Sequence, residues 1–384
     1  MRKKLVVLGA GIGGLTVIDE LKKLRSTVDV DITLVDENFS HFLGFTLPWV
    51  MRGWRGVDSV PIRPTAEALI TVSTVEGTVV KIDPQARLVY LADDSTLDYD
   101  ALVVALGSKN DTSMVSGLTD AVEIGAAVHY YSANGAADAH RALVNFRGGR
   151  LVFLVTALPY RCPVAPYEGA LLAADLLEEQ GVRAAAEIAV YSPEQQPMPS
   201  AGPYAGPQLL GILADKNIAF HAQHSATHVD CAARTISFAN GETVNFDLLV
   251  FIPPHRPAIT LGGSGWINID RHTMKTDYEG VWAVGDITAV TSPSDKPLPK
   301  AAIFAKNGGR AAAQNVLTYL GLATETSELS GLGYCYLDTG MHQSAQGKGD
   351  FFALPHPAVR LTGPSDVLHR DKIQEEADWR TLWE

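Results

Sequence analysis

The sequence has few cysteines and fewer basic than acidic residues. Three cysteines in 384 residues are too few and too widely spaced for the disulfide framework of a secreted protein. Any disulfide in this chain would therefore have a chemical role and not a structural one. Asp and Glu number 43 against 31 for Lys and Arg, and the net charge of −12 repels nucleic acid. No run of about 18 apolar residues, the length that spans a membrane, is present. We therefore expect a cytoplasmic protein with no nucleic-acid partner.

The length and composition indicate a folded chain of more than one domain. A chain of 384 residues exceeds the size of one ordinary hydrophobic core. Hydrophobic residues make up 46% of the chain and charged residues 19%, which excludes a disordered or fibrous protein. Two or three domains are expected.

A glycine motif opens the chain. A short apolar run at residues 5–8 leads into Gly9, Gly11 and Gly14, and a helical pattern follows over residues 15–24. The three glycines stand at the positions of G-x-G-x-x-G, which allow a tight turn and close approach of a pyrophosphate to a helix N-terminus. Glycine-rich turns are common, so this motif gains weight only with the segments that follow it.

Four later segments complete the pattern of a dinucleotide site. An apolar strand ends at Asp36, whose carboxylate suits a ribose 2′-hydroxyl. A second buried strand runs into Gly107, and a pattern of the same kind recurs over residues 246–252. A third strand ends in Gly285 and Asp286, where a carboxylate could reach a ribityl hydroxyl. Each segment alone could be an ordinary core strand or a turn with a solvated acid, but their order favours function.

In this order the motifs resemble the flavoproteins with two dinucleotide-binding domains, the glutathione-reductase-like class. The resemblance implies an α/β fold with two Rossmann-like domains, a small C-terminal interface domain, and bound FAD. It divides the chain into a discontinuous FAD-binding domain at 1–110 and 240–320, a second Rossmann-like domain at 111–239, and a C-terminal domain at 321–384.

Two features of this class are missing. The strand at residues 150–155 is followed by three prolines and bulky side chains, with no glycine before Gly169, so the second lobe lacks the usual NAD fingerprint. The segment at residues 41–49, after the ribose acid, contains no cysteine pair. These absences disfavour NAD binding and thioredoxin-reductase-like chemistry.

Cys162 stands in the proline-rich loop that replaces the NAD fingerprint. It follows Arg161 and directly precedes a helical pattern, two features that lower a thiol pKa. The alternative is a small buried core cysteine. Cys335, in a glycine-rich segment between two tyrosines, is equally compatible with packing and with function. We interpret Cys231 as structural.

Lys300 stands at the start of another predicted helix, in the segment Pro-Leu-Pro-Lys-Ala-Ala. A cation at this position opposes the preference set by the helix dipole, which favours a functional role over that of a solvated first-turn residue.

The segments around Arg161-Cys162-Pro163, Cys335 and Lys300 resemble the sulfide:quinone oxidoreductase and flavocytochrome c sulfide dehydrogenase family. The resemblance implies that Cys162 and Cys335 form a redox disulfide beside the flavin, which sulfide attacks to leave a persulfide. Lys300 would face the pyrimidine edge of the flavin. Glu168 would move a proton or contact FAD, although stabilisation of a helix N-terminus explains it equally well.

The same resemblance implies the cofactor and partners. FAD would be non-covalent, because no cysteine lies near residues 39–46. The substrate would be sulfide or a small thiol or persulfide, and the acceptor a quinone or another molecule. Peripheral contact with the inner face of a membrane and a homo-oligomer stay open. No metal site is expected, although His221, His224 and His228 have the spacing of a helix face.

Two other functions are consistent with the motifs. One is an NAD(P)H-dependent flavoprotein reductase. The other is a non-catalytic FAD-binding module that relays electrons within a complex.

Overall fold

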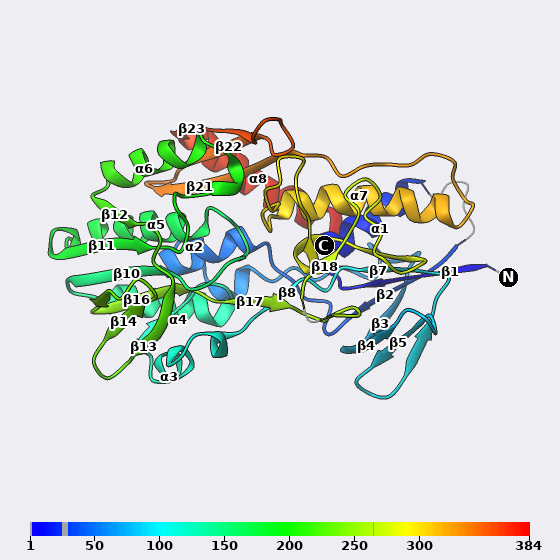
Figure 1. Cartoon of the computed structure of the whole chain (residues 1–384), viewed down its shortest axis with the longest axis horizontal. Helices are drawn as coiled ribbons and strands as arrows, with labels where there is room; N and C mark the ends of the chain where they lie inside the picture. The colour runs from blue at the N-terminus through cyan, green and yellow to red at the C-terminus, as the bar shows by residue number, and fades with distance from the viewer. Residues whose placement is uncertain (1, 25–29, 264) are drawn as a thin grey trace.

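The computed structural model describes residues 2–24, 30–263 and 265–384, and two five-stranded parallel sheets form its centre (Figure 1). The strand orders are β19-β7-β1-β2-β3 and β12-β11-β10-β16-β9. Helices cover these sheets, as expected for parallel strands that are buried on both faces. The predicted α/β class with two Rossmann-like lobes is confirmed.

The first sheet is built from the N-terminal motifs. Its strands are β1 (Lys3–Leu8), β2 (Val30–Asp36), β3 (Ser73–Glu76), β7 (Ala101–Val104) and β19 (Val281–Ala283). Helices α1 (Ile12–Leu24) and α7 (Ala302–Tyr319) pack against each other on one face. On the other side lies a small antiparallel sheet of β4 (Val79–Asp83), β5 (Leu88–Leu91) and β6 (Thr96–Asp98) (Figure 1).

The second sheet occupies the middle of the chain. Its strands are β9 (Ala127–Val128), β10 (Gly149–Val155), β11 (Ala186–Tyr191), β12 (Ile218–His221) and β16 (Leu248–Ile252). Its helices are α3 (Leu118–Glu123), α4 (Ala133–Asn145), α5 (Ala165–Glu179) and α6 (Ala205–Asp215). An antiparallel sheet of β13 (Ala226–Asp230), β14 (Thr235–Phe238) and β15 (Thr243–Asn245) adjoins it. His221 and His228 therefore lie on different strands, and the predicted helix face is wrong.

Strand β16 falls on the other side of the boundary predicted at residue 240. Its five residues are all buried, and it pairs in parallel with β10, not with a strand of the first sheet. A fully apolar strand fits either buried sheet, so its sequence does not say which one it joins. The chain returns to the first sheet only after β16, at β19.

Short elements connect these sheets. Strands β8 (Ser108–Asn110) and β17 (His255–Pro257) pair antiparallel where the chain crosses between the sheets (Figure 1). Strands β18 (Ile267–Asn268) and β20 (Thr288–Ala289) pair in parallel, and α2 (Leu47–Arg52) packs on α4 and α5. Single 3₁₀ turns are η2 (Gly44–Thr46), η3 (Val57–Ser59), η4 (Thr112–Met114), η5 (Arg183–Ala185), η6 (Pro199–Ala201) and η7 (Gly285–Ile287).

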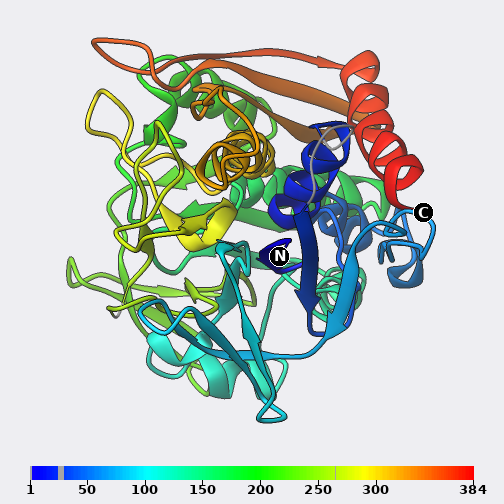
Figure 2. The same ribbon diagram turned by 90° about the vertical axis from the view of Figure 1, so that its right-hand side faces the viewer.

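The C-terminal segment forms an antiparallel sheet and a final helix. The sheet comprises β21 (Leu332–Gly340), β22 (Gln343–Asp350) and β23 (Ala358–Ser365), and α8 (Asp366–Trp383) follows. Figure 2 shows this sheet in orange along one edge of the molecule, with α8 descending from it beside the N-terminal elements. Among the described residues, no helix has both the length and the apolar character needed to cross a membrane.

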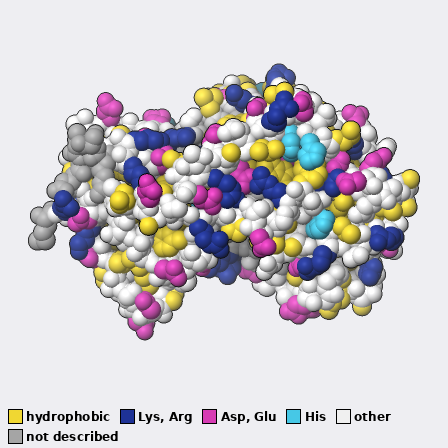
Figure 3. All heavy atoms as spheres, turned by 180° about the vertical axis from the view of Figure 1, so that it is seen from behind, with side chains coloured by type: hydrophobic (Ala, Val, Ile, Leu, Met, Phe, Trp, Pro, Cys, Tyr) yellow, Lys and Arg dark blue, Asp and Glu magenta, His cyan; other side chains and the backbone are white. Residues whose placement is uncertain are grey.

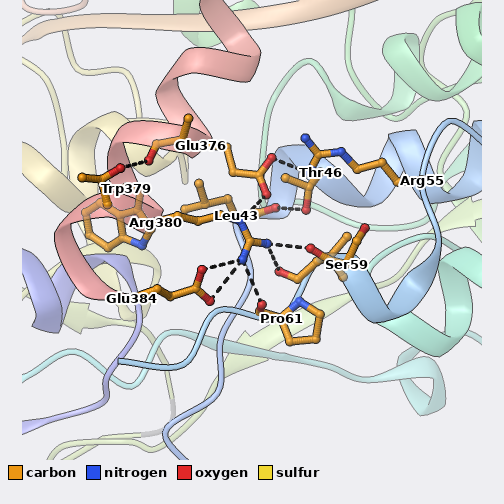
Figure 4. Close-up of polar contacts among 12 residues, drawn as sticks. Leu43, Thr46, Arg55, Ser59, Pro61, Glu376, Trp379, Arg380 and Glu384 are labelled. Atoms are coloured by element: carbon orange, nitrogen blue, oxygen red, sulfur yellow. Dashed lines mark hydrogen bonds and ion pairs between the residues drawn. The ribbon is translucent and has the colours of Figure 1, made fainter. Parts of the chain in front are cut away.

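The end of α8 is anchored to the segment after α2 (Figure 4). The Arg380 guanidinium donates to the carbonyl oxygens of Ser59 at 2.7 Å and Pro61 at 3.2 Å, and to Glu384 at 2.9 Å. Trp379 and Trp383 are buried, whereas the Leu382 side chain is 44% exposed. The tail thus docks on the protein itself.

We expect Trp383→Ala to lower the free energy of unfolding by about 3–5 kcal/mol, because the indole is fully enclosed and truncation leaves a cavity. Leu382→Ala, one residue earlier on the exposed side, is the control and should stay within about 0.5 kcal/mol of wild type. Urea unfolding of both variants measures this. Equal losses would mean that the tail is not docked as described.

Candidate active site

A cavity of about 450 Å³ lies where the carboxyl ends of β1, β2, β7 and β19 meet the starts of α5 and α7 and the strand β21. The chain therefore brings together residues from its first, middle and last segments. Nine of the ten predicted site residues line this cavity: Gly9, Gly11, Asp36, Gly107, Cys162, Glu168, Asp286, Lys300 and Cys335. The tenth, Gly14, is buried just behind the glycine turn.

Each of the three glycines of the turn is required for a different structural reason. Gly9 has a φ of +100°, and a Cβ there would lie 2.6 Å from the carbonyl oxygen of Ala105. A Cβ on Gly14 would lie 1.9 Å from the carbonyl oxygen of Gly9, so only glycine lets α1 pack on the turn. Gly11 faces open space in the cavity wall. Turn, close packing and free approach are the three requirements of a dinucleotide fingerprint.

Asp36 is fixed at the end of β2 by the main chain. Its Oδ2 accepts a hydrogen bond from the Ala10 N–H at 2.7 Å, and its Oδ1 accepts from Phe39 N–H at 2.9 Å. These bonds hold the carboxylate at the cavity wall and join it to the glycine turn. The arrangement suits recognition of a ribose hydroxyl.

Lys300 is buried in the wall of the same cavity. Its Nζ donates to the carbonyl oxygens of Asp286 at 2.7 Å and Thr288 at 3.0 Å, and lies 3.5 Å from the centre of the Trp266 ring. Burial lowers the pKa of Lys300 to about 8 and raises the pKa of Asp286. Lys300 is therefore not a solvated residue.

Helix α7 begins at this wall without a side-chain cap. Its N-cap is Ala301, which makes no side-chain hydrogen bond, and Ala302 and Ile303 line the cavity. The first N–H groups of a helix lack partners within the helix and favour negative charge. A cation and a helix N-terminus thus both face a site suited to an anionic ligand.

Cys162 is tied to Lys300 through the main chain. The Cys162 N–H donates to the Lys300 carbonyl oxygen at 2.8 Å, which couples the proline-rich loop to the segment before α7. Cys162 has a φ of +60°, a conformation that costs a residue with a Cβ roughly 1–3 kcal/mol and tends to occur at functional sites.

The thiol environment differs from the sequence-based expectation. Burial raises the pKa of Cys162 to about 12 and also raises that of Cys335, whereas we expected a lowered pKa for Cys162. Burial is the largest effect on the Cys162 pKa. Hydrogen bonds from the backbone N–H groups of Val164 and Ala165 lower this pKa, as expected at a helix start, but by less than burial raises it. The Arg161 guanidinium instead donates to Asn110 Oδ1 at 2.8 Å and to His255 Nε2 at 2.9 Å.

Cys162 and Cys335 line the same cavity from different elements. Cys162 precedes α5, and Cys335 lies on β21; both pack against the same hydrophobic cluster. All three cysteines of the chain, each within the described residues, carry free thiols in the structure. All three are half-buried, and Cys231 packs against a different hydrophobic cluster, beside the separate antiparallel sheet.

Glu168 belongs to a buried charge cluster that the sequence did not reveal. Its Oε1 accepts the Asp338 N–H at 3.0 Å and a hydrogen bond from Lys372 Nζ. Lys372 Nζ also donates to Asp338 Oδ2 at 2.6 Å, and all three side chains have no solvent exposure. Burial raises the pKa of Glu168 to about 7. No motif marks Lys372 or Asp338, because Glu168 and Lys372 lie 204 residues apart.

Several buried polar atoms on the cavity residues lack partners among the described residues. These are His41 Nδ1, Ser108 Oγ and Glu168 Oε2. The Trp379 indole N–H donates to His41 Nε2 at 2.9 Å, so the neutral His41 ring carries its proton on Nδ1. Buried polar atoms need partners, and a bound dinucleotide with many acceptors would supply them. The residues present fit FAD.

The second lobe shows a different arrangement where a nicotinamide cofactor would bind. Glu194, just beyond the end of β11, is buried and accepts hydrogen bonds from Tyr167 at 2.8 Å and Tyr160 at 3.1 Å. Glu194 stands where the ribose-binding carboxylate of a nicotinamide site is expected. Its carboxylate is already hydrogen-bonded to these two tyrosine hydroxyls of the protein.

The glycine turn, the acid of β2, the Gly-Asp turn and two paired lobes define a dinucleotide-binding flavoprotein fold. The sequence matches the pyridine nucleotide-disulphide oxidoreductase family over residues 3–309, and the chain belongs to this family. It is an FAD-dependent oxidoreductase, which confirms the enzyme class and cofactor inferred from the motifs.

Individual relatives agree with this assignment. The chain is 23% identical over 320 residues to the mitochondrial sulfide:quinone oxidoreductase of Mus musculus, covering 79% of this chain and 69% of the relative. It is 24% identical over 326 residues to a sulfide-quinone reductase of Aquifex aeolicus, covering 78% and 71%. The structure of the sulfide:quinone oxidoreductase from Aquifex aeolicus superposes with a TM-score of 0.85, at 20% identity, over 98% of this chain and 90% of that one. The predicted similarity to this group is confirmed.

Gly14→Ala should abolish retention of FAD, because the added Cβ cannot fit beside the Gly9 carbonyl oxygen. The measurement is the flavin absorbance per chain of the purified protein. Gly211→Ala, in α6 where a Cβ meets nothing within 4 Å, is the matched control and should bind FAD fully. Full FAD in the Gly14 variant would contradict this account of the turn.

The raised pKa of Glu168 predicts a pH-dependent contribution to stability. Between its usual pKa of 4.5 and the folded value of about 7, the folded state holds a proton that the unfolded state has lost. The free energy of unfolding should therefore fall as the pH rises through this window. Glu168→Gln should flatten this dependence, whereas Glu178→Gln, exposed on the same helix, should not. Denaturant titrations between pH 4.5 and 7.5 measure it. Parallel profiles for wild type and Glu168→Gln would show that Glu168 is not perturbed.

Proposed function

We propose that this chain oxidises sulfide, or a small thiol or persulfide, through a redox disulfide between Cys162 and Cys335. The electrons pass to FAD and then to a quinone or another acceptor. The observation that carries the proposal is the position of both cysteines on the wall of the cavity that fits the cofactor. The names of the two relatives described above, both sulfide:quinone oxidoreductases, support the choice of substrate.

The sulfur chemistry is a thiol–disulfide exchange. Hydrosulfide attacks one sulfur of the Cys162–Cys335 disulfide; one S–S bond forms, one breaks, and the other cysteine leaves as a thiolate. Burial raises the pKa of both cysteines, so each thiol keeps its proton when the pair is reduced. FAD, when bound, supplies the two-electron acceptor for this site.

The residues that would hold FAD come from the first lobe. Gly9 and Gly11 would approach its pyrophosphate, Asp36 its ribose, and Asp286 its ribityl chain. Lys300 and the start of α7, which line the same cavity, would stabilise negative charge on the cofactor. No cysteine lies in the residue 39–46 segment, so we propose non-covalent binding.

We propose that the two lobes and the C-terminal segment have different roles in the reaction. The first lobe, residues 1–110 and the returning segment up to about 320, binds FAD; the second lobe supplies Cys162 and Glu168; and residues 321–384 supply Cys335. Because β16 belongs to the second sheet, the returning segment begins after Ile252 and not at residue 240.

A quinone site needs an apolar slot beside the flavin, but polar side chains line the cavity near Cys335. Tyr334 donates to Glu375 Oε1 at 3.2 Å, and Lys306 donates to the same oxygen at 2.8 Å. Tyr334, Tyr336 and Glu375 line the cavity, whereas Phe351 packs on Phe304 in the core. For this reason the proposal keeps an acceptor other than quinone open.

An NAD(P)H-dependent reductase is the second candidate. A type II NADH:quinone oxidoreductase of Staphylococcus aureus is 36% identical over 121 residues, although this covers only 31% of the chain and 30% of the relative. The occupation of Glu194 by Tyr160 and Tyr167 argues against a nicotinamide site in the second lobe.

Under anaerobic conditions we expect sulfide, but not NADH, to bleach the flavin absorbance of the purified protein. Cys162→Ser and Cys335→Ser should each reduce the bleaching rate by roughly 10³-fold or more, because the exchange step is lost. Cys231→Ser is the matched control and should bleach like wild type. Bleaching by NADH alone would overturn the proposal in favour of the second candidate. A flavin that resists both reagents would instead indicate a non-catalytic electron-relay module.

A further inference from the structure

A chain of hydrogen-bonded side chains runs from the cavity to the surface. It begins at Glu168 and continues through Lys372 and Asp338 to His369 Nδ1, which lies 2.7 Å from Asp338 Oδ1. His369 Nε2 lies 3.4 Å from Nδ1 of His342. His342 is exposed, whereas the other four members are buried. The path thus has one end in the cavity and one in solvent.

We propose that this chain of five residues is the proton path between the redox cavity and solvent. The inference rests on the proposed function, since it concerns the proton set free by sulfide oxidation. Attack of hydrosulfide on the disulfide gives a persulfide Cys–S–SH and a cysteine thiolate. Loss of the persulfide proton gives Cys–S–S⁻, and the buried cavity needs a base to take that proton and a route to remove it.

Glu168 is placed to be the first acceptor. Its Oε1 is engaged by Lys372 and by the Asp338 N–H, while Oε2 has no partner among the described residues and belongs to a cavity-lining side chain. The proton is therefore taken up at Oε2, and a turn of the carboxyl group about its Cγ–Cδ bond brings that proton to the side of Lys372. A carboxyl group whose proton affinity lies near neutrality can both accept and release a proton at working pH.

The next steps use groups that both donate and accept. Lys372 first gives one of its own ammonium protons to Asp338 Oδ2 and then takes the Glu168 proton on the lone pair that this leaves, so its charge is the same before and after the transfer. Asp338 takes the proton at Oδ2, where the Trp49 indole N–H also donates at 2.6 Å. A turn of the carboxyl group then brings the proton to the position of Oδ1, which faces His369 and accepts from Ser344. His369 then takes the proton at one ring nitrogen and releases a proton from the other.

The outer end of the path is suited to proton exchange with water. The His342 ring stacks on Trp54 at 4.3 Å between ring centres and contacts the His369 ring edge to face at 5.2 Å. The Glu179 carboxylate, paired with Arg52, interacts electrostatically with His342. On the face of the molecule shown in Figure 3, histidine side chains reach the surface beside apolar and basic side chains.

The first test needs no substrate. The FAD-loaded protein is mixed rapidly with D₂O, and the shift of the protonated Glu168 carboxyl band is followed by infrared spectroscopy; Glu168→Gln identifies the band by removing it. We expect His369→Gln to slow the exchange by about 100-fold and His342→Gln to slow it less. His356→Gln, exposed elsewhere, is the control. Exchange at the wild-type rate in His369→Gln would overturn the proposal.

The second test follows the proton during turnover. A pH-indicator dye reports proton release after hydrosulfide is mixed with the oxidised protein, while alkylation and mass measurement report the persulfide. We expect His342→Gln to form the persulfide but to release the proton slowly, and added imidazole to restore the rate. No rescue, together with unchanged exchange in the first test, would mean a structural role only.

The two tests also separate two kinds of failure. If the wild-type protein forms no persulfide, the proposed sulfide chemistry is wrong, yet the first test still decides whether the path carries protons to Glu168. If persulfide forms and the proton appears in His369→Gln as fast as in wild type, the chemistry stands and the path is wrong.

Discussion

One lysine ammonium between two carboxylates holds the cysteine-bearing part of this molecule together. Lys372 of α8 bonds to Glu168 of α5 and Asp338 of β21, and none of the three side chains is exposed. Removing such charges from water costs several kcal/mol for each ion, so the cluster is stable only because each member is well bonded. These bonds join three elements that are distant in sequence.

The cluster also explains which group is left to carry a proton. Two carboxylates and one ammonium leave an excess of negative charge in the interior. Although burial opposes the shift, Lys372 and His369 hold the pKa of Asp338 well below its usual range. Glu168 has fewer partners, and burial and the Asp338 charge raise its pKa. The cavity therefore contains one carboxyl group, that of Glu168, with a pKa of about 7. It lies where the proposed chemistry releases a proton.

The sequence predicted what depends on local geometry. Gly9, Gly14, Asp36 and Asp286 belong to motifs in which a strand, a turn and a helix follow one another, so their roles can be inferred from spacing. The partnership of Glu168 with Lys372 depends on how α8 returns across the molecule, and no local pattern encodes it. The pKa of Cys162 was predicted in the wrong direction for a similar reason: the helix start and Arg161 are visible in the sequence, but burial and the true direction of the guanidinium are not.

Lys300 joins the two lobes through a contact that is likewise distant in sequence. Lys300 bonds through its side chain to the Asp286–Thr288 segment of the first lobe and through its carbonyl oxygen to Cys162 of the second. A movement of either lobe would therefore change the position of Cys162 relative to Asp286. Lys372 performs the equivalent task from the C-terminal segment, since it sets β21, and with it Cys335, against α5. The two lysines thus fix the elements that carry the two half-buried cysteines at the wall of one cavity, as the proposed reaction between their sulfur atoms and a bound flavin would require.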